Sequence, residues 1–181
     1  AKNMVTKVKF MYENLPSWLK IDAPENNKLT LRLSNGSQIK ATAASSDAGR
    51  SEAVSLLLID EAAFIENIGE IWASAQQTLA TGGGCIALST PHGTGNWFHQ
   101  TWVRAENKEN DFLPIKLPWY VHPERDQSWR DRQDELLGDP RMAAQECDCD
   151  FSTSGDTVFY SEYLEFYEQT YIKDPLEKRG A

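Results

Sequence analysis

Histidine, cysteine and basic side chains are scarce in this sequence, and each scarcity excludes a class of protein. Three histidines among 181 residues argue against a histidine-based metal site. Three cysteines, an odd number, predict free thiols rather than a disulfide framework, and Cys147-x-Cys149 has no second ligand pair for zinc. The 18 basic residues face 27 acidic ones, so the net charge is −9. A surface of that average charge repels DNA phosphates and leaves only local contacts with DNA.

Long apolar runs are absent as well. No run reaches the length needed to cross a membrane, and the sequence has no recognisable signal peptide. We therefore expect a soluble, cytoplasmic protein without a membrane partner. A hydrophobic fraction of 40% in 181 residues is enough for one core, which predicts one domain with a tail.

The sequence also lacks a phosphate-binding loop of the G-x-x-x-x-G-K-[ST] type, or a looser Gly-Lys-Thr or Gly-Lys-Ser variant. Its glycine run, Gly82-Gly83-Gly84, is followed by Cys85 rather than by lysine and a hydroxyl residue. Without such a loop there is no nest of backbone N–H groups for phosphates and no lysine to neutralise them. We therefore expect the chain alone to hold no nucleotide and to turn over no ATP.

The most informative stretch that is present is an apolar run, Leu56–Ile59, which leads directly into Asp60 and Glu61. An unbroken run predicts a strand buried on both faces, as in a parallel sheet. Ligands of open α/β sheets bind beyond the carboxyl ends of the strands, where this acidic pair would lie. In phosphoryl transfer one carboxylate can hold Mg²⁺ while the other deprotonates an attacking water. The alternative is an acidic strand end that is merely solvated.

A second apolar run, Cys85–Leu88, ends in the hydroxyl residues Ser89 and Thr90. Between the two runs, the apolar positions of Ile68–Ala80 recur at helical spacing and predict a crossover helix. Strand, helix and strand form a right-handed parallel unit, so both strand ends would meet at one sheet edge. Hydroxyl groups there can contact a γ-phosphate and respond to its loss. The alternative is an ordinary strand-end turn rich in proline and glycine.

Several stretches in a fixed order carry a resemblance to a known family. The stretches are Asp47–Ser51, Leu56–Phe64, Ser89–Gly93, Asn96–His99, Gln145–Glu146 and Phe151–Gly155. Their joint order and spacing resemble the large terminase subunit of tailed bacteriophages, a DNA-packaging motor with an ATPase domain followed by a nuclease domain. The likeness runs from about Met4 to about Phe159.

The resemblance implies a fold and a domain organisation. The expected fold is α/β, a partial P-loop NTPase-type core whose parallel sheet is flanked by helices. In that family the phosphate loop precedes the segment where this sequence begins, and the nuclease domain follows where it ends. We therefore expect an internal fragment, with residues 1–155 as the C-terminal part of the ATPase domain. Residues 156–181 would be the linker toward a nuclease domain that is absent here.

The resemblance also assigns roles to individual residues. Asp60 would bind Mg²⁺, Glu61 would activate water for ATP hydrolysis, and Ser89 and Thr90 would contact the nucleotide and couple phosphate release to motion. The cofactors of the parent protein would be Mg²⁺ and ATP. Arg50 lies in a loop of small residues and has two interpretations. In one interpretation, Arg50 is an arginine finger whose positive charge stabilises a phosphate in a neighbouring subunit, as in some family members. In the other, its side chain donates hydrogen bonds to nearby backbone carbonyl oxygens.

The partners that the resemblance implies are double-stranded DNA, the portal protein and the small terminase subunit, with a ring of copies on the procapsid in the host cytoplasm. Two rival functions stay open. A nucleic-acid helicase fragment would carry similar motifs, but the acidic balance speaks against the basic surfaces that it needs. A non-catalytic interaction module would be favoured if Asp60, Glu61 and Thr90 lay far apart.

The remaining segments predict a hairpin and a helical C-terminal part around this core. Lys2–Asn14 is expected to be a helix with Val5 and Met11 in the core. Trp102 is expected to pack on other aromatic rings. His92 is expected to be a solvent-facing turn residue. The other predicted elements are strands at Leu29–Leu33, Gln38–Ala43 and Asp111–Leu117, helices at Trp129–Leu137 and Arg141–Asp148, and an amphipathic aromatic segment at Ser161–Ile172.

Overall fold

The computed structural model of the 181-residue chain describes residues 2–44, 54–79, 82–151, 163, 166–167 and 170–171. The chain divides into two compact units. The first comprises Ala1–Ser55 and Asn67–Gly83, and the second comprises Leu56–Glu66 and Gly84–Ala181. Each unit combines helices and strands, as the predicted α/β class requires. No helix within the described ranges is long and apolar enough to span a bilayer.

The first unit begins with helix α1 (Lys2–Glu13), which confirms the helix predicted from apolar spacing. Val5 is its buried anchor, with only 1% of its surface exposed, and the helix packs against strand β2 (Thr30–Arg32). Met11 is 65% exposed, so its predicted place in the core is wrong. The three-residue strand β2 is too short to cover one whole face of the twelve-residue helix α1.

The predicted hairpin is confirmed, with shorter strands than expected. Strands β1 (Glu25–Asn26), β2 and β3 (Gln38–Lys40) form an antiparallel sheet in the order β1-β2-β3, in which Thr30 lies opposite Lys40. The turn between β2 and β3 contains Gly36 at φ +88°, a conformation that glycine adopts without steric cost. The two-residue strand β1 was not predicted, because so short a strand leaves no periodic pattern.

Helix α2 (Ile68–Leu79) confirms the helix predicted between the two apolar runs, and the predicted last residue, Ala80, lies outside the described ranges. Its buried side chains, Ile68, Ile71 and Ala75, are spaced by three and four residues, the period of one helical face. Gly83 follows the helix at a close approach to the carbonyl oxygen of Val54. A Cβ atom at that position would overlap this oxygen, so glycine is required there.

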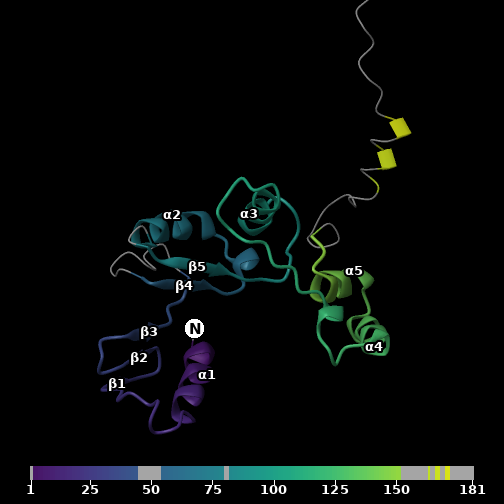
Figure 1. The fold of residues 1–181 in the computed structure, drawn as a ribbon. Coiled ribbons are helices and arrows are strands. Elements are labelled where there is room, and N and C mark those ends of the chain that lie inside the picture. Colours follow the sequence, from purple (N-terminus) through teal and green to yellow (C-terminus); the bar gives the residue numbers. More distant parts are fainter. Residues whose placement is uncertain are drawn as a thin grey trace, which may run out of the picture. The chain divides into compact units, whose positions relative to one another are not determined.

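The second unit contains the predicted pair of parallel strands. Strand β4 (Leu56–Ile59) pairs with β5 (Gly84–Ala87) in parallel, and Figure 1 shows the two lying side by side. The prediction that β4 is buried on both faces is wrong, because Leu56 is 57% exposed and Leu58 is 43% exposed. The sheet has only two strands among the described residues, so only Ile59 at its carboxyl end is enclosed.

Helix α3 (Trp97–Glu106) follows β5 and begins at Asn96, whose side-chain oxygen accepts a hydrogen bond from the backbone N–H of His99. Asparagine is a preferred residue at this capping position because it satisfies an otherwise unpaired N–H group. The strand predicted at Asp111–Leu117 is wrong. This segment belongs to no sheet, because no strand pairs with it within the described ranges.

The C-terminal part of the second unit is helical, as predicted. Helix α4 (Gln127–Leu137) ends at Gly138, which adopts φ +66°, and the next helix begins with proline at its first position. Both residues are common at helix ends. Glycine readily adopts the left-handed conformation that ends a helix, and proline is well tolerated at the first helical position. The other short elements of this unit are the turns η1 (Ala62–Phe64) and η2 (Trp119–Val121), helix α5 (Pro140–Ala143) and the π-type turn η3 (Ala144–Asp148).

Two sequence predictions fall on residues outside the described ranges. The loop that carries Arg50 is one of them, so both interpretations of Arg50 stay predictions. The amphipathic segment Ser161–Ile172 is described only in part, and its aromatic side chains that are described are 60–62% exposed. These side chains are Tyr163, Phe166, Tyr167 and Tyr171.

Candidate functional site

Hydrogen bonds join the segments that follow the two parallel strands. The N–H of Leu88 donates to the carbonyl oxygen of Ile59 over 2.9 Å, and the carbonyl oxygen of Leu88 accepts from the N–H of Ala62 over 3.1 Å. The Ser89 hydroxyl then accepts from the N–H of Ala63 over 3.2 Å. The segment that carries the acidic pair is therefore fixed to the segment that carries the hydroxyl residues.

The acidic pair occupies the sharp turn between β4 and η1, and both carboxylates are exposed. Glu61 adopts φ +55° and ψ +41°, a left-handed conformation that costs a non-glycine residue about 1–2 kcal/mol. Lys108 and Cys149 also have positive φ, but they lie just past helical segments, where this conformation is common. Glu61 instead precedes a turn. Such strain in a non-glycine residue motivates a hypothesis of function.

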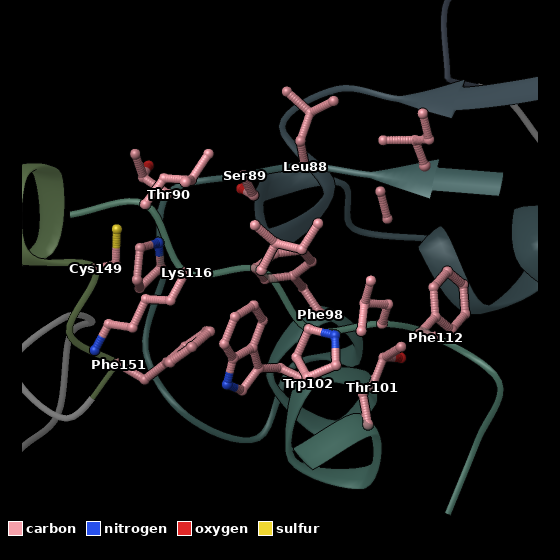
Figure 2. Close-up of a pocket in the computed structure, with 18 of the residues that line it drawn as sticks. Leu88, Ser89, Thr90, Phe98, Thr101, Trp102, Phe112, Lys116, Cys149 and Phe151 are labelled. Carbon is pink, nitrogen blue, oxygen red and sulfur yellow. The ribbon is translucent and has the colours of Figure 1, made fainter. Parts of the chain in front are cut away.

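A cavity of about 810 Å³ opens beside this turn within the second unit. Its lining includes Asp60, Glu61, Ser89 and Thr90 as well as the charged residues Asp111, Lys116 and Glu146, and is otherwise mostly apolar. Figure 2 shows side chains from β5, from α3 and from the segment after α3 turned toward one another. The apolar lining includes Cys85, Ile86, Leu88, Phe98, Trp102, Phe112, Leu113, Ile115, Leu117 and Phe151.

One wall of the cavity is an aromatic cluster centred on Phe151. Its ring lies 6.1 Å from that of Phe98 and 6.0 Å from that of Trp102, centroid to centroid, and 5.0 Å from the His99 imidazole. The predicted packing of Trp102 on other aromatic rings is confirmed. Sequence reasoning did not assign this wall to a site, because Phe98 and Trp102 have the spacing of any core-facing pair on a helix and Phe151 is distant in the chain.

The two cysteines that line the cavity are neutral thiols. Burial raises the pKa of Cys85 from its ordinary value of 9.0 to about 11. Burial also raises the pKa of Cys149, against a smaller opposing effect from the backbone N–H of Leu117. A thiol rather than a thiolate is a poor nucleophile and a poor metal ligand. These cysteines therefore belong to the apolar lining.

The predicted site residues that line the cavity fit magnesium better than a metal that needs a protein cage. Within the described ranges, no three His, Cys, Asp or Glu side chains gather closely enough to hold an ion. Asp60 is exposed and has the oxygen ligands that Mg²⁺ prefers. Because Mg²⁺ usually keeps several waters and takes one or two carboxylates plus substrate phosphates, a single carboxylate is compatible with it.

The loop that follows Thr90 is held by its own hydrogen bonds. The side-chain amide of Asn96 donates to the carbonyl oxygens of His92 and Gly93 over 2.7 and 3.2 Å. The imidazole of His92 is exposed and stacks on Phe64 at 4.4 Å between ring centroids, so its prediction as a solvent-facing turn residue is confirmed. The η1 turn and the hydroxyl segment are thereby in contact at a second place.

The structure brings most of the predicted site residues to one place. Asp60, Glu61, Ser89 and Thr90 line the same cavity, and Arg50 lies outside the described ranges. The wide separation of Asp60, Glu61 and Thr90 that would favour a non-catalytic module is not found.

Comparison with protein families gives a match over residues 1–166 to a family described as terminase large subunit, T4likevirus-type, N-terminal. The matched range includes both parallel strands, α3 and every residue that lines the cavity. The resemblance found in the order of the motifs is confirmed. This chain therefore belongs to the T4likevirus-type family of large terminase subunits and corresponds to the N-terminal region of such a subunit.

Proposed function

We propose that this chain is part of a DNA-packaging ATPase and carries its magnesium ligand, its general base and the hydroxyl groups that respond to phosphate. Membership of the large terminase family supports a role in packaging phage DNA. The observation that carries the proposal is the hydrogen bond from the Ala63 N–H to the Ser89 hydroxyl. This bond joins the turn of Asp60 and Glu61 to the end of the neighbouring strand.

Asp60 holds the metal in this proposal. It follows the carboxyl end of β4, the position at which open α/β sheets bind ligands. Bound Mg²⁺ supplies positive charge to the phosphate oxygens and thereby lowers the cost of the charge that develops during transfer. The part of Asp60 is to fix the place of that charge, directly or through ordered water.

Glu61 acts as the general base. It accepts a proton from a water molecule while the water oxygen forms a bond to the γ-phosphorus and the bond to the bridging oxygen of ADP breaks. The left-handed backbone of Glu61 interrupts the regular strand alternation, in which successive side chains point to opposite faces of the sheet. In this proposal the two adjacent carboxylates serve two tasks at the turn that follows the strand.

Ser89 and Thr90 link the chemistry to motion. A hydroxyl group that bonds a γ-phosphate must find another partner once the phosphate leaves. Because the Ser89 hydroxyl accepts a hydrogen bond from the N–H of Ala63, a shift of this hydroxyl also displaces the η1 turn. We assign the coupling of ATP hydrolysis to movement of double-stranded DNA to this connection, with Arg50 acting on the phosphate of a neighbouring subunit.

The proposed motor needs further components besides these 181 residues. The phosphate-binding loop has no counterpart in the 181 residues, so the proposal places it in another part of the full-length terminase. The portal protein and the small terminase subunit are the proposed protein partners. The net charge of −9 means that contact with DNA is restricted to local basic positions.

The test uses the full-length terminase polypeptide that contains this sequence. Glu61→Gln removes the proton acceptor and keeps the size of the side chain, so kcat for ATP should fall by about a hundredfold or more while nucleotide affinity stays within a few-fold. Asp60→Asn should instead weaken Mg²⁺ dependence and nucleotide binding together. Glu66→Gln, an exposed carboxylate past the same turn, is the matched control. Normal turnover by Glu61→Gln would overturn the catalytic assignment.

A further inference from the structure

One side chain, Asn96, bonds both ends of the loop that leads from the hydroxyl residues to helix α3. Its amide nitrogen donates to the carbonyl oxygens of His92 and Gly93 over 2.7 and 3.2 Å. Its amide oxygen accepts from the N–H of His99 over 3.0 Å and thereby caps α3. Asn96 therefore holds the backbone just past Thr90 with its donor group and the start of the helix with its acceptor group.

The first part of this loop is attached to the η1 turn. Pro91 is fully buried, and the imidazole of His92 stacks on Phe64 of η1 at 4.4 Å between ring centroids. Just before the loop, the Ser89 hydroxyl accepts a hydrogen bond from the N–H of Ala63, which also belongs to η1. A displacement of the turn that follows the acidic pair is therefore shared by this part of the loop.

The second part of the loop is attached to α3 instead. The N–H of Gly95 donates to the His99 imidazole over 3.1 Å, and the side-chain amide of Gln100 donates to the carbonyl oxygen of Gly95 over 2.6 Å. Gly93 and Gly95 have positive φ values of +71° and +85°, and glycine has more backbone freedom than any other residue. The hydrogen bonds from Asn96 therefore join the two parts of the loop across a pair of flexible positions.

Helix α3 contacts a residue that is distant in the chain. The rings of Phe98 and Trp102 on α3 lie 6.1 and 6.0 Å from the ring of Phe151, centroid to centroid. Figure 2 shows these three side chains in one view with Ser89 and Thr90. A shift of α3 therefore reaches Phe151, from which the chain continues toward its C-terminus.

We propose that Asn96 is a positioning residue that transmits displacement of the Ser89–Thr90 segment to helix α3. Asn96 makes no contact with phosphate in this proposal and acts through the backbone just past Thr90. The inference rests on the proposed function, because it names the element that receives the movement caused by phosphate release. Without the two donor bonds of Asn96, the hydroxyl residues and α3 would move independently. ATP hydrolysis would then continue with little movement of DNA.

Substitution can separate the two bonding groups of Asn96. Asn96→Asp keeps the oxygen that caps α3 and places a negative charge at the helix start, where it is favourable. It replaces the amide donor by an oxygen, so the bonds to the carbonyl groups of His92 and Gly93 are lost. Asn96→Ser also keeps a capping oxygen and lacks the amide donor. Gln100→Ala, which removes a hydrogen bond to Gly95 in the same loop, is the matched control.

Amide hydrogen exchange of the 181-residue chain tests the connection without any measurement of ATP hydrolysis. Asn96→Asp should release the Ser89 segment and raise the exchange rate of the Ala63 N–H at least about tenfold. The His99 N–H keeps its cap and should exchange at its original rate, and Gln100→Ala should leave Ala63 unchanged. Unchanged exchange of Ala63 in Asn96→Asp would overturn the proposal. A failure of Glu61→Gln to reduce turnover would leave these exchange results unaffected.

A packaging reaction with the full-length terminase, procapsids and double-stranded DNA tests the consequence for movement. Asn96→Asp and Asn96→Ser should hydrolyse ATP within about threefold of the normal rate but package at least about tenfold fewer base pairs per ATP. Gln100→Ala should keep the normal ratio of packaging to hydrolysis. If Asn96 served the fold alone, hydrolysis and packaging would fall in proportion. That outcome, or a normal ratio in both Asn96 variants, would contradict the proposal.

Discussion

The hydroxyl oxygen of Ser89 lies 3.2 Å from the backbone nitrogen of Ala63 and accepts its hydrogen bond, across 26 residues of sequence. Ala63 is only 7% exposed, so water has little access to its N–H group. A buried donor that loses its partner retains the full cost of desolvation. This single bond therefore contributes to stability as well as to the proposed coupling between the strand ends.

Ser89→Ala should lower the free energy of unfolding by about 1–2 kcal/mol, because it leaves the Ala63 N–H unsatisfied. Urea denaturation of the 181-residue chain measures this difference. Ser37→Ala, at an exposed turn position, is the control and should change stability by less than about 0.5 kcal/mol. Equal effects of the two substitutions would mean that the Ser89 bond contributes nothing.

Glu61→Gly should separate stability from function. Glycine adopts φ +55° without the steric cost that glutamate bears, although it gains entropy in the unfolded state. The free energy of unfolding should therefore not fall and should rise by up to about 1 kcal/mol. In the full-length terminase the same change should abolish ATP turnover, since the base is lost. A clear loss of stability in Glu61→Gly would show that the side chain serves the fold.

The pH dependence of stability should reveal the half-buried thiol at position 85. The folded-state pKa of Cys85 is about 11 and its ordinary value is 9.0, so the folded chain retains its proton where the unfolded chain loses it. The stabilisation is fully present below pH 9.0 and is lost as the pH rises toward about 11. Denaturation of the chain and of Cys85→Ala from pH 8 to 11 should show a steeper decline for the unmodified chain. Parallel declines would contradict the raised pKa.

Arg130 should contribute measurably to the stability of the helical C-terminal part. Its side chain is 11% exposed, and its guanidinium donates to both carboxylate oxygens of Asp148 over 3.3 and 2.9 Å and also pairs with Asp134. The hydrogen bonds to Asp148 and Asp134 raise the pKa of the guanidinium above its ordinary value. The bonds to Asp148 also connect α4 with η3. Arg130→Ala should lower the free energy of unfolding by about 1–3 kcal/mol.

The control for Arg130 is Arg132→Ala, which removes an exposed arginine from the same helix. Arg130→Lys keeps the charge but loses the two-pronged geometry, so it should recover only part of the loss. Thermal unfolding distinguishes these outcomes. Full recovery by lysine would show that charge alone, rather than the paired hydrogen bonds to Asp148, stabilises this contact.

The isolated 181-residue chain should show no Mg²⁺-dependent ATP turnover. The reason is that the 181 residues contain no phosphate-binding loop with its lysine and its nest of backbone N–H groups. A steady-state phosphate-release assay measures this. Turnover by the isolated chain that disappears in Glu61→Ala would prove that the loop is dispensable and that the expectation of an internal fragment is wrong.

Local patterns were sufficient for the elements that carry strong periodicity or strong turn chemistry. The helical spacing of the apolar positions in Ile68–Ala80 predicted α2, and the patterns of Leu29–Leu33 and Gln38–Ala43 predicted the hairpin. The parallel pairing of β4 with β5 also followed from two apolar runs and a helical spacer. The helix and the hairpin depend on neighbours in sequence, and the parallel pairing could be predicted because strand, helix and strand in succession form a parallel unit.

Burial and pairing depended instead on residues that are distant in the chain. The pattern of Asp111–Leu117 is that of a strand, yet a strand forms only when a partner supplies hydrogen bonds, and the structure describes none beside it. Leu56 and Leu58 have the composition of a doubly buried strand but remain exposed for the same reason. The sequence by itself determined the chemistry at the strand ends, from Asp60 and Glu61 to Ser89 and Thr90. Only the tertiary structure decided that these residues share one cavity, that Glu61 is left-handed, and that Ser89 bonds Ala63, because each of these facts requires contact between segments far apart in sequence.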